Sequence, residues 1–393
     1  MKKKNNFNIL NLNKILLFLT LLLFQLSPTQ NIAVLIIGLI VLVNTYTFIK
    51  KNLKVKKKNI LMVFVMILFT FYMIRTPYIL GTEAQVEVFW LLFGVLIFVA
   101  IITSGLTIES LLFIVIINGL IGGGLTIISY FTAFYFGGMV SPPYAGTRAV
   151  GGFDGPNELA SYQLLIASIS FGVMVHNKYN INKFYLILSI IISVITIFLT
   201  YSRGGIIGLG ILTIIFYVFY TRKNFKKTML YLIPITFILI ITFHKYGLPL
   251  ISQFNNVRRN RSERNYLTEE VVHLFTEKPI FGWGLGSFGE ISAVRNAVPH
   301  NEFYLFLISG GIISIFLFVA FLSWTLGLSI KKRLYPVAFF LIVFITQELT
   351  FNHLIRGRVS ILFWIVISLI FINNSFKKCK DENIEQRKAV TGN

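Results

Sequence analysis

Long apolar segments recur along nearly the whole chain, and they limit its possible folds more than any other feature. Crossing the hydrocarbon core of a bilayer takes about 20 apolar residues in a helix, because lipid cannot satisfy backbone donors and acceptors. About twelve such spans would leave only short loops, so the sequence predicts an all-α membrane protein whose residues 1–393 form a single polytopic domain. The spans are expected near 9–27, 31–49, 59–76, 86–104, 107–130, 157–176, 183–201, 203–221, 228–245, 301–325, 334–350 and 359–375.

The composition agrees with this class of protein. Hydrophobic residues make up 55% of the chain and charged residues 13%, whereas soluble proteins carry about 25% charged residues. The net charge of +21 would indicate a nucleic-acid ligand in a soluble protein, but basic residues also collect on cytoplasmic loops. We therefore expect the lipid bilayer, and no nucleic acid, as a partner. Cys379 is the single cysteine, which excludes an intrachain disulfide and a cysteine-based zinc site.

Basic clusters set the expected orientation. With the N-terminus in the cytoplasm, the cluster at 50–58 and the tail at 376–393 both lie inside, as the positive-inside rule requires. The N-terminal MKKKNNFNIL and the apolar run after it resemble a signal peptide, but no small-x-small cleavage site follows, so an uncleaved first helix is expected. The sequence thus predicts a multi-pass protein of the cytoplasmic membrane with both termini cytoplasmic.

The outer face is expected to bind an anion. Its basic residues are mostly arginine, with Lys245 and Lys278 as exceptions, and arginine makes bidentate contacts to phosphate and carboxylate groups. Two outer loops are of real size, at 131–156 and 246–300. The second contains ERNYLTEEVVHLFTEK, whose apolar residues follow helical spacing up to Pro279, which predicts an amphipathic helix over the membrane mouth.

Two short motifs place arginines near the outer ends of spans. In TRAVGGFDGPNELA, Arg148 lies in a glycine-rich turn and Asn157 is suited to cap the following helix; the simpler interpretation is a helix-opening turn. In TYSRGGIIG, Arg203 must lie at or just below the outer surface, because the turn between the two spans is so short. An arginine near hydrocarbon is costly and usually functional, although it can also be an interface residue that reaches toward water.

The third candidate region is the end of the second outer loop. Arg264 opens the predicted amphipathic helix, and the run PIFGWGLGSF, with Gly284 and Gly286, closes it. His300 and Asn301 then stand at the start of the next span. A histidine there can act as a neutral base near pH 7; its alternative role is a cap or an interface residue.

Together these residues suit one kind of chemistry. Arg148, Arg203, Arg264 and His300 come from four places in the sequence, yet the predicted topology puts all of them on one face. The arginines would stabilise the charge on a diphosphate leaving group, and the histidine would take the proton of an attacking hydroxyl. No metal site is expected in this set.

At these residues the chain resembles the O-antigen ligase and O-antigen polymerase superfamily of bacterial membrane glycosyltransferases. The similarity extends from about 145 to 320, and the twelve-helix layout also resembles that family. The motifs are an Arg-x-x-Gly-x-x-x-x-Pro-Asn-x-x-Ala turn from Arg148 to Ala160, Ser202–Gly204, Arg264, the glycine run Pro279–Phe288, and His300–Asn301.

The resemblance implies metal-independent and cofactor-free transfer of a glycan from a polyprenyl-diphosphate-linked oligosaccharide to a glycan acceptor, on the outer leaflet. By position, Arg203 and Arg264 would hold the diphosphate and His300 would activate the acceptor hydroxyl, while Arg148 matches a further family position. A composition rich in Ile, Phe, Asn and Lys indicates an AT-rich genome and is compatible with a Gram-positive capsule or wall polymer. This favours a polysaccharide polymerase over the alternative, an O-antigen ligase acting on lipid A-core or another acceptor.

A transporter or flippase of lipid-linked oligosaccharide is the alternative from another class. It would predict charges at mid-membrane and broken helices that line a path. The expected spans are nearly free of mid-depth charge, since Glu109 and Glu348 lie near span ends. A purely structural scaffold would leave the outer arginines unexplained.

Overall fold

The computed structural model describes residues 2–26, 30–50, 57–74, 82–144, 147–176, 178–219, 261–292, 301–349 and 357–372. Within these ranges the chain is helical, apart from turns and two isolated β-bridges, one joining Ser141 to Gly151 and one joining Tyr144 to Arg148. The helices are α1 (Lys2–Gln25), α2 (Gln30–Lys50), α3 (Lys57–Ile74), α4 (Thr82–Thr103), α5 (Ile108–Thr132), the short η1 (Phe136–Gly138), α6 (Pro156–His176), α7 (Lys183–Leu199), an unlabelled helix (Arg203–Phe219), α10 (Arg261–Glu277), α11 (Ser287–Ile291), α12 (Glu302–Lys331), α13 (Tyr335–Glu348) and α14 (Arg358–Ser368).

The predicted all-helical membrane architecture is confirmed for the described residues. Among the described residues, four segments are long and apolar enough to cross a bilayer, and several shorter apolar helices accompany them. The predicted span at 228–245 and the tail at 376–393 lie outside the described residues, so the number of about twelve spans stays a prediction. The four long segments are Gln85–Thr103, Ile108–Thr132, Pro156–Val175 and Glu302–Lys331.

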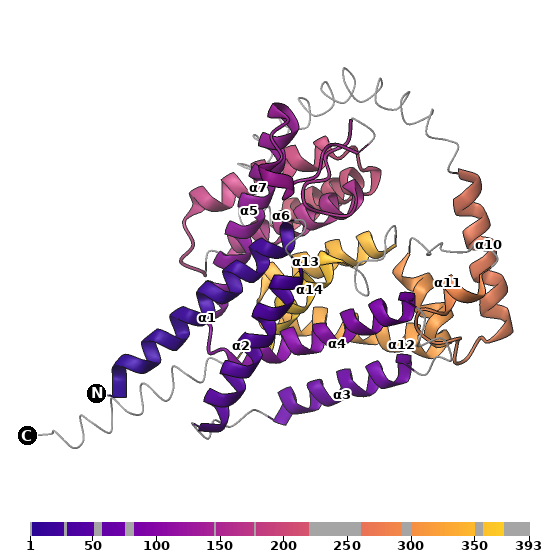
Figure 1. Cartoon of the computed structure of the whole chain (residues 1–393), viewed down its shortest axis with the longest axis horizontal. Coiled ribbons are helices and arrows are strands. Elements are labelled where there is room, and N and C mark those ends of the chain that lie inside the picture. The colour runs from indigo at the N-terminus through magenta and orange to yellow at the C-terminus, as the bar shows by residue number, and fades with distance from the viewer. Residues whose placement is uncertain are drawn as a thin grey trace, which may run out of the picture.

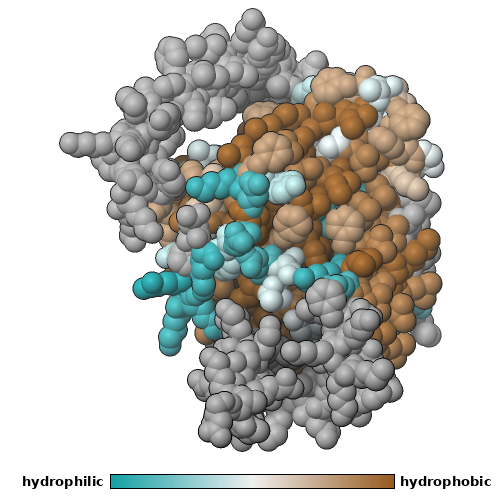
Figure 2. All heavy atoms as spheres, turned by 90° about the vertical axis from the view of Figure 1, so that its left-hand side faces the viewer, coloured by the Kyte–Doolittle hydropathy of each residue, from teal (hydrophilic) through white to brown (hydrophobic). Residues whose placement is uncertain are grey.

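Much of the molecular surface is apolar, as the bilayer requires. Leu35, Phe131 and Phe316 are 73%, 70% and 71% exposed, respectively. Figure 2 shows apolar residues over a large part of one face, with the hydrophilic ones gathered in a smaller area. Such a surface would make a soluble protein aggregate, whereas in a membrane it faces the lipid tails.

Helix α6 is the central element. It contacts α5, α7, α13 and α14, and residues 158–170 are buried without exception. Its polar side chains meet partners inside the bundle: Gln163 donates to the Gly119 carbonyl of α5 (3.2 Å) and accepts from the Ser193 hydroxyl of α7 (2.9 Å). Because the Gln163 and Ser193 side chains are fully buried, these bonds both satisfy the polar groups and join three helices.

Glycines allow the neighbours of α6 to approach closely. The span expected at 107–130 contains Gly119 and Gly122–Gly124, a pattern typical of either a kink or close packing. The structure shows close packing in a continuous α5. A Cβ atom on Gly119 would lie 2.6 Å from the Ile166 side chain of α6. On α6 itself, a Cβ on Gly172 would lie 2.4 Å from Cα of Pro336 at the start of α13. A glycine at such a position lets two helices approach more closely than a larger residue would allow.

Helix α12 is interrupted at Gly311, whose φ of 64° and ψ of −161° are not helical. Backbone of the preceding loop fits into this break. The Trp283 and Gly284 amides donate to the Ile308 and Ser309 carbonyls (2.8 and 2.7 Å), and the Ile312 amide donates to the Pro279 carbonyl (2.9 Å). The loop and the broken helix therefore form one hydrogen-bonded unit, which Figure 1 shows beside α10 and α11.

Candidate functional site

Arg148 joins the loop at 131–156, which the sequence predicts to lie outside, to the ends of two helices. Its Nε donates to the Thr200 carbonyl after α7 (2.9 Å), and its Nη2 donates to Asn157 Oδ1 in α6 (3.1 Å). The Ala149 amide also donates to the Leu199 carbonyl (2.9 Å). The loop is thus fixed against α6 and α7, and the arginine is held by two neutral oxygens.

The expectation that Asn157 caps α6 is wrong. The helix begins at Pro156, so Asn157 lies inside the first turn and its side chain accepts from Arg148 instead. Proline is favoured at the first helical position, because its missing N–H would have no intrahelical partner there. Glu158 serves the helix start, since its Oε2 accepts from the Asp154 amide (3.2 Å).

Arg203 lies close to Arg148. It is exposed and is the first residue of the helix Arg203–Phe219, directly after the turn that ends α7. Burial lowers the pKa of the Arg148 guanidinium, and the positive charge of Arg203 lowers it further, although Tyr144 acts in the opposite direction. Within the described ranges Arg148 makes no ion pair. Two guanidinium groups that repel one another are an arrangement that a bound anion would stabilise.

Helix α13 brings the start of α12 to the same end of the bundle. Gln347 accepts from the Ser161 hydroxyl of α6 (3.0 Å) and donates to the Gly204 carbonyl (3.1 Å), next to Arg203. Two residues further on, the Leu349 carbonyl accepts from Asn301 (3.1 Å). Asn301 is the N-cap of α12 and accepts from the Phe303 and Tyr304 amides (2.9 and 3.4 Å). Asn301, which directly follows His300, is therefore bound to the end of α13, the helix that also contacts Gly204 beside Arg203.

Two predicted site residues are not placed by these contacts. His300 lies outside the described residues, and so does the side chain of Arg264, although its backbone belongs to α10. The predicted amphipathic helix is present: Val271 and Leu274 are buried and pack with Phe288 and Ile308. Figure 1 shows α10 at the edge of the molecule beside α11 and α12, away from α6 and α7. The structure thus brings Arg148 and Arg203 together and leaves the contribution of Arg264 a prediction.

The predicted supporting glycines hold the loop. Gly284 and Gly286 have φ of 95° and 71°, which residues with a side chain rarely adopt. The Gly284 amide donates to the Ser309 carbonyl (2.7 Å), and the Gly286 amide donates to the buried carboxylate of Glu87 (2.7 Å). These amides are used within the fold, so the glycine run is a structural connection.

The site includes a residue that the motifs did not single out. Arg358, the first residue of α14, is 2% exposed and reaches the first turn of α6, where its amide donates to Glu158 Oε1 (2.9 Å). Its Nη1 lies 3.5 Å from Asp154 Oδ1 and 3.8 Å from Glu158 Oε2. The sequence contained one signal for this residue. Arg358 directly precedes the expected span at 359–375, at the end predicted to face outside, where arginines are enriched.

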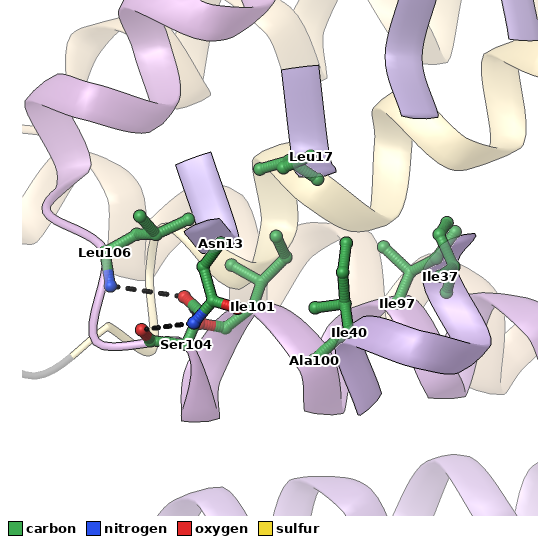
Figure 3. Close-up of a pocket in the computed structure, with 9 residues that line it drawn as sticks. All are labelled: Asn13, Leu17, Ile37, Ile40, Ile97, Ala100, Ile101, Ser104 and Leu106. Atoms are coloured by element: carbon green, nitrogen blue, oxygen red, sulfur yellow. Dashed lines mark hydrogen bonds between the residues drawn. The ribbon is translucent and has the colours of Figure 1, made fainter. Parts of the chain in front are cut away.

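A small apolar pocket lies at the N-terminal end of α5, at the other end of this helix from the loop that carries Arg148. It is not a candidate reaction site. It lies among α1, α2, α4 and the turn at Ser104, and Ile37, Ile40 and Leu106 contribute to its lining (Figure 3). Asn13 crosses this region to Asn44 Oδ1 (2.7 Å) and to the Ser104 carbonyl (3.2 Å). The pocket is lined by no acid, base or cation, so it offers no group for catalysis.

The fold is that of a multi-pass membrane protein, and comparison with known families makes the class more specific. Residues 188–319, about a third of the chain, match the family described as O-Antigen ligase. The chain therefore carries an O-antigen ligase domain, from a family of membrane glycan-transfer enzymes. The matched range includes Arg203, Arg264 and His300 but not Arg148. No curated protein matches the chain.

Proposed function

We propose that the protein transfers or polymerises a polyprenyl-diphosphate-linked glycan at the outer face of the cytoplasmic membrane. The observation that carries this proposal is the pair Arg148 and Arg203, in which the side-chain hydrogen bonds of Arg148 with the described residues are accepted by neutral oxygens. Such a pair supplies positive charge where a diphosphate would sit, at the end of the bundle that the predicted topology places outside. The O-antigen ligase domain supports the reaction class.

In the proposed reaction, a hydroxyl oxygen of the acceptor attacks the anomeric carbon of the donor glycan. The bond from that carbon to the diphosphate oxygen breaks, and the polyprenyl diphosphate leaves with the electron pair. Arg148 and Arg203 stabilise the charge that develops on the leaving oxygen, and Arg264 adds to them if α10 contributes its first turn. His300 accepts the proton of the attacking hydroxyl.

Polymerase and ligase differ in the acceptor, which is a second carrier-linked repeat unit for a polymerase and another molecule for a ligase. We favour the polymerase because of the composition of the chain. A broken helix was expected for the transporter alternative, and α12 is broken. Its break is filled, however: a Cβ on Gly311 would lie only 2.3 Å from the Ile280 carbonyl oxygen. The interruption therefore supports a loop and gives no support to a path through the membrane.

The test is the glycan profile of cells that lack the gene and are complemented with wild type, Arg148→Ala or His300→Ala. Lys183→Ala is the matched control, because Lys183 is an exposed cation at the other end of α7. A polymerase predicts that single repeat units stay on the lipid carrier in the deletion strain and in both site variants. Complete but unattached polymer would identify a ligase. Normal polymer and normal attachment in the deletion strain would refute glycan transfer.

A further inference from the structure

Tyr144 lies directly opposite Arg148 in the loop at 131–156. The Tyr144 amide donates to the Arg148 carbonyl (2.7 Å), and the Arg148 amide donates to the Tyr144 carbonyl (3.1 Å), so the two residues form an antiparallel bridge. Residues paired in this way carry their side chains on the same face of the bridge. Tyr144 is also among the groups that act electrostatically on the Arg148 guanidinium. The tyrosine ring therefore stands beside the proposed anion site.

The position of this tyrosine is fixed by its surroundings. The hydroxyl of Tyr130, near the end of α5, donates to the Thr147 carbonyl (3.0 Å), which holds the bridge against that helix. Pro142–Pro143 directly precede Tyr144, and each proline fixes its own φ angle. A side chain whose backbone is already ordered loses less conformational entropy when it binds a ligand.

The ring and one atom of the arginine remain available to a ligand. The Tyr144 side chain is exposed, at 61%. Arg148 uses Nε and Nη2 to bind Thr200 and Asn157, and none of the described residues accepts a hydrogen bond from its Nη1. A phosphate oxygen bound to Nη1 would therefore lie next to an exposed aromatic ring.

The donor of the proposed reaction has matching chemistry on the two sides of the bond that breaks. Its first sugar, the one bonded to the diphosphate, begins at the anomeric carbon next to the diphosphate oxygen. A pyranose ring presents a face of C–H groups, which packs favourably on the negative face of an aromatic ring. The tyrosine hydroxyl can in addition exchange hydrogen bonds with sugar hydroxyls. An arginine for the phosphate and a neighbouring tyrosine for the sugar thus fit this part of the donor.

We propose that Tyr144 binds the first sugar of the donor, with its ring packed against the apolar face of that sugar while Arg148 holds the diphosphate. This inference rests on the proposed function and adds a residue that distinguishes a sugar-bearing carrier from a bare one. Tyrosine is also common at membrane interfaces. An interface residue would contribute equally to the binding of both carriers, whereas a sugar contact contributes to one of them.

The experiment measures binding to the purified full-length protein in detergent, by native mass spectrometry. The probes are undecaprenyl diphosphate and the same carrier bearing a single N-acetylglucosamine, N-acetylgalactosamine, glucose or galactose. We expect wild type to bind at least one sugar-bearing carrier about threefold to tenfold more tightly than the bare carrier, the size of one aromatic contact. Tyr144→Leu should reduce this preference to less than about twofold and leave binding of the bare carrier within about twofold of wild type.

Two further variants make the test specific to the ring of Tyr144. Tyr144→Phe keeps the aromatic face and should keep most of the preference for the sugar-bearing carrier. Phe131→Leu is the matched control, because Phe131 is a 70% exposed aromatic residue at the end of α5, directly before the same loop. It should bind both carriers like wild type.

The inference is overturned if wild type prefers none of the four sugar-bearing carriers, or if Tyr144→Leu keeps the preference or weakens binding of both carriers equally. It is also overturned if Tyr144→Phe loses the preference, or if Phe131→Leu loses as much of it as Tyr144→Leu. Each of these results, with normal binding of the bare carrier by wild type, leaves the proposed function intact. A wild-type protein that does not bind undecaprenyl diphosphate would instead refute the proposed function, and the inference with it.

Discussion

Replacing Gly311 by alanine should release the loop at 279–286 from α12. The glycine has φ of 64° and ψ of −161°, a region of backbone conformation that is essentially restricted to glycine. A Cβ atom there would lie 2.3 Å from the Ile280 carbonyl oxygen and 2.4 Å from its carbon. The obstacle is backbone, so no side chain can rotate to make room.

The magnitude follows from these two effects. Forcing alanine into this conformation costs about 1–3 kcal/mol. Relieving the clash requires the loop to move away, which weakens the hydrogen bonds from the Trp283 and Gly284 amides to the Ile308 and Ser309 carbonyls. Each buried bond contributes about 1 kcal/mol. We expect Gly311→Ala to lower the free energy of unfolding by about 3–5 kcal/mol.

Thermal unfolding of the purified protein in detergent measures this change, together with the glycan profile of complemented cells. Gly327→Ala is the matched control, because Gly327 lies in the same helix, has no positive φ, and a Cβ atom added to it would meet no heavy atom within 4 Å. Alanine at that position should leave stability unchanged or raise it by up to about 1 kcal/mol. If Gly311→Ala unfolds at the same temperature as Gly327→Ala, the loop is not held by the break in α12.

Three further predictions concern the core and the chemistry. Gln347→Leu removes the bonds to Ser161 and to the Gly204 carbonyl; it should cost about 1–3 kcal/mol of stability and weaken binding of undecaprenyl diphosphate, and unchanged values of both would refute the link. Gly172→Ala should destabilise the contact of α6 with α13 by at least about 2 kcal/mol in thermal unfolding, whereas Gly210→Ala, which has open space around it, should not. Glycan transfer in proteoliposomes should continue after treatment with EDTA; loss of activity that added metal restores would overturn the metal-independent mechanism.

Features encoded locally were predictable from the sequence. The apolar segments predicted the helices, and the spacing of apolar residues before Pro279 predicted α10, which spans Arg261–Glu277. The glycines of α5 indicated either a kink or close packing, because small residues let helix backbones approach one another. Each of these predictions depends on residues within a few turns of one another.

Features that depend on distant partners could not be predicted in the same way. The pairing of Arg358 with Glu158 joins residues 200 positions apart, and nothing in either local sequence identifies the other. The break at Gly311 was also not expected. The backbone groups that fill it belong to the loop at 279–286, and the local sequence around Gly311 does not show that this loop lies there. For Asn157, the competing preference of Pro156 for the first helical position decided where α6 begins.

The burial of α6 limits how directly the surrounding lipid can change the geometry near Arg148. Residues 158–170 of α6 are buried throughout. The part of α6 that follows the contact with Arg148 therefore does not face the bilayer. Changes in membrane thickness or lipid species act on the peripheral helices first and reach this segment of α6 only through the packing of those helices. In the proposed reaction, the polyprenyl tail would be recognised by the helices at the periphery of the bundle. The protein thus separates the part that must tolerate a variable solvent from the part that must keep a fixed geometry.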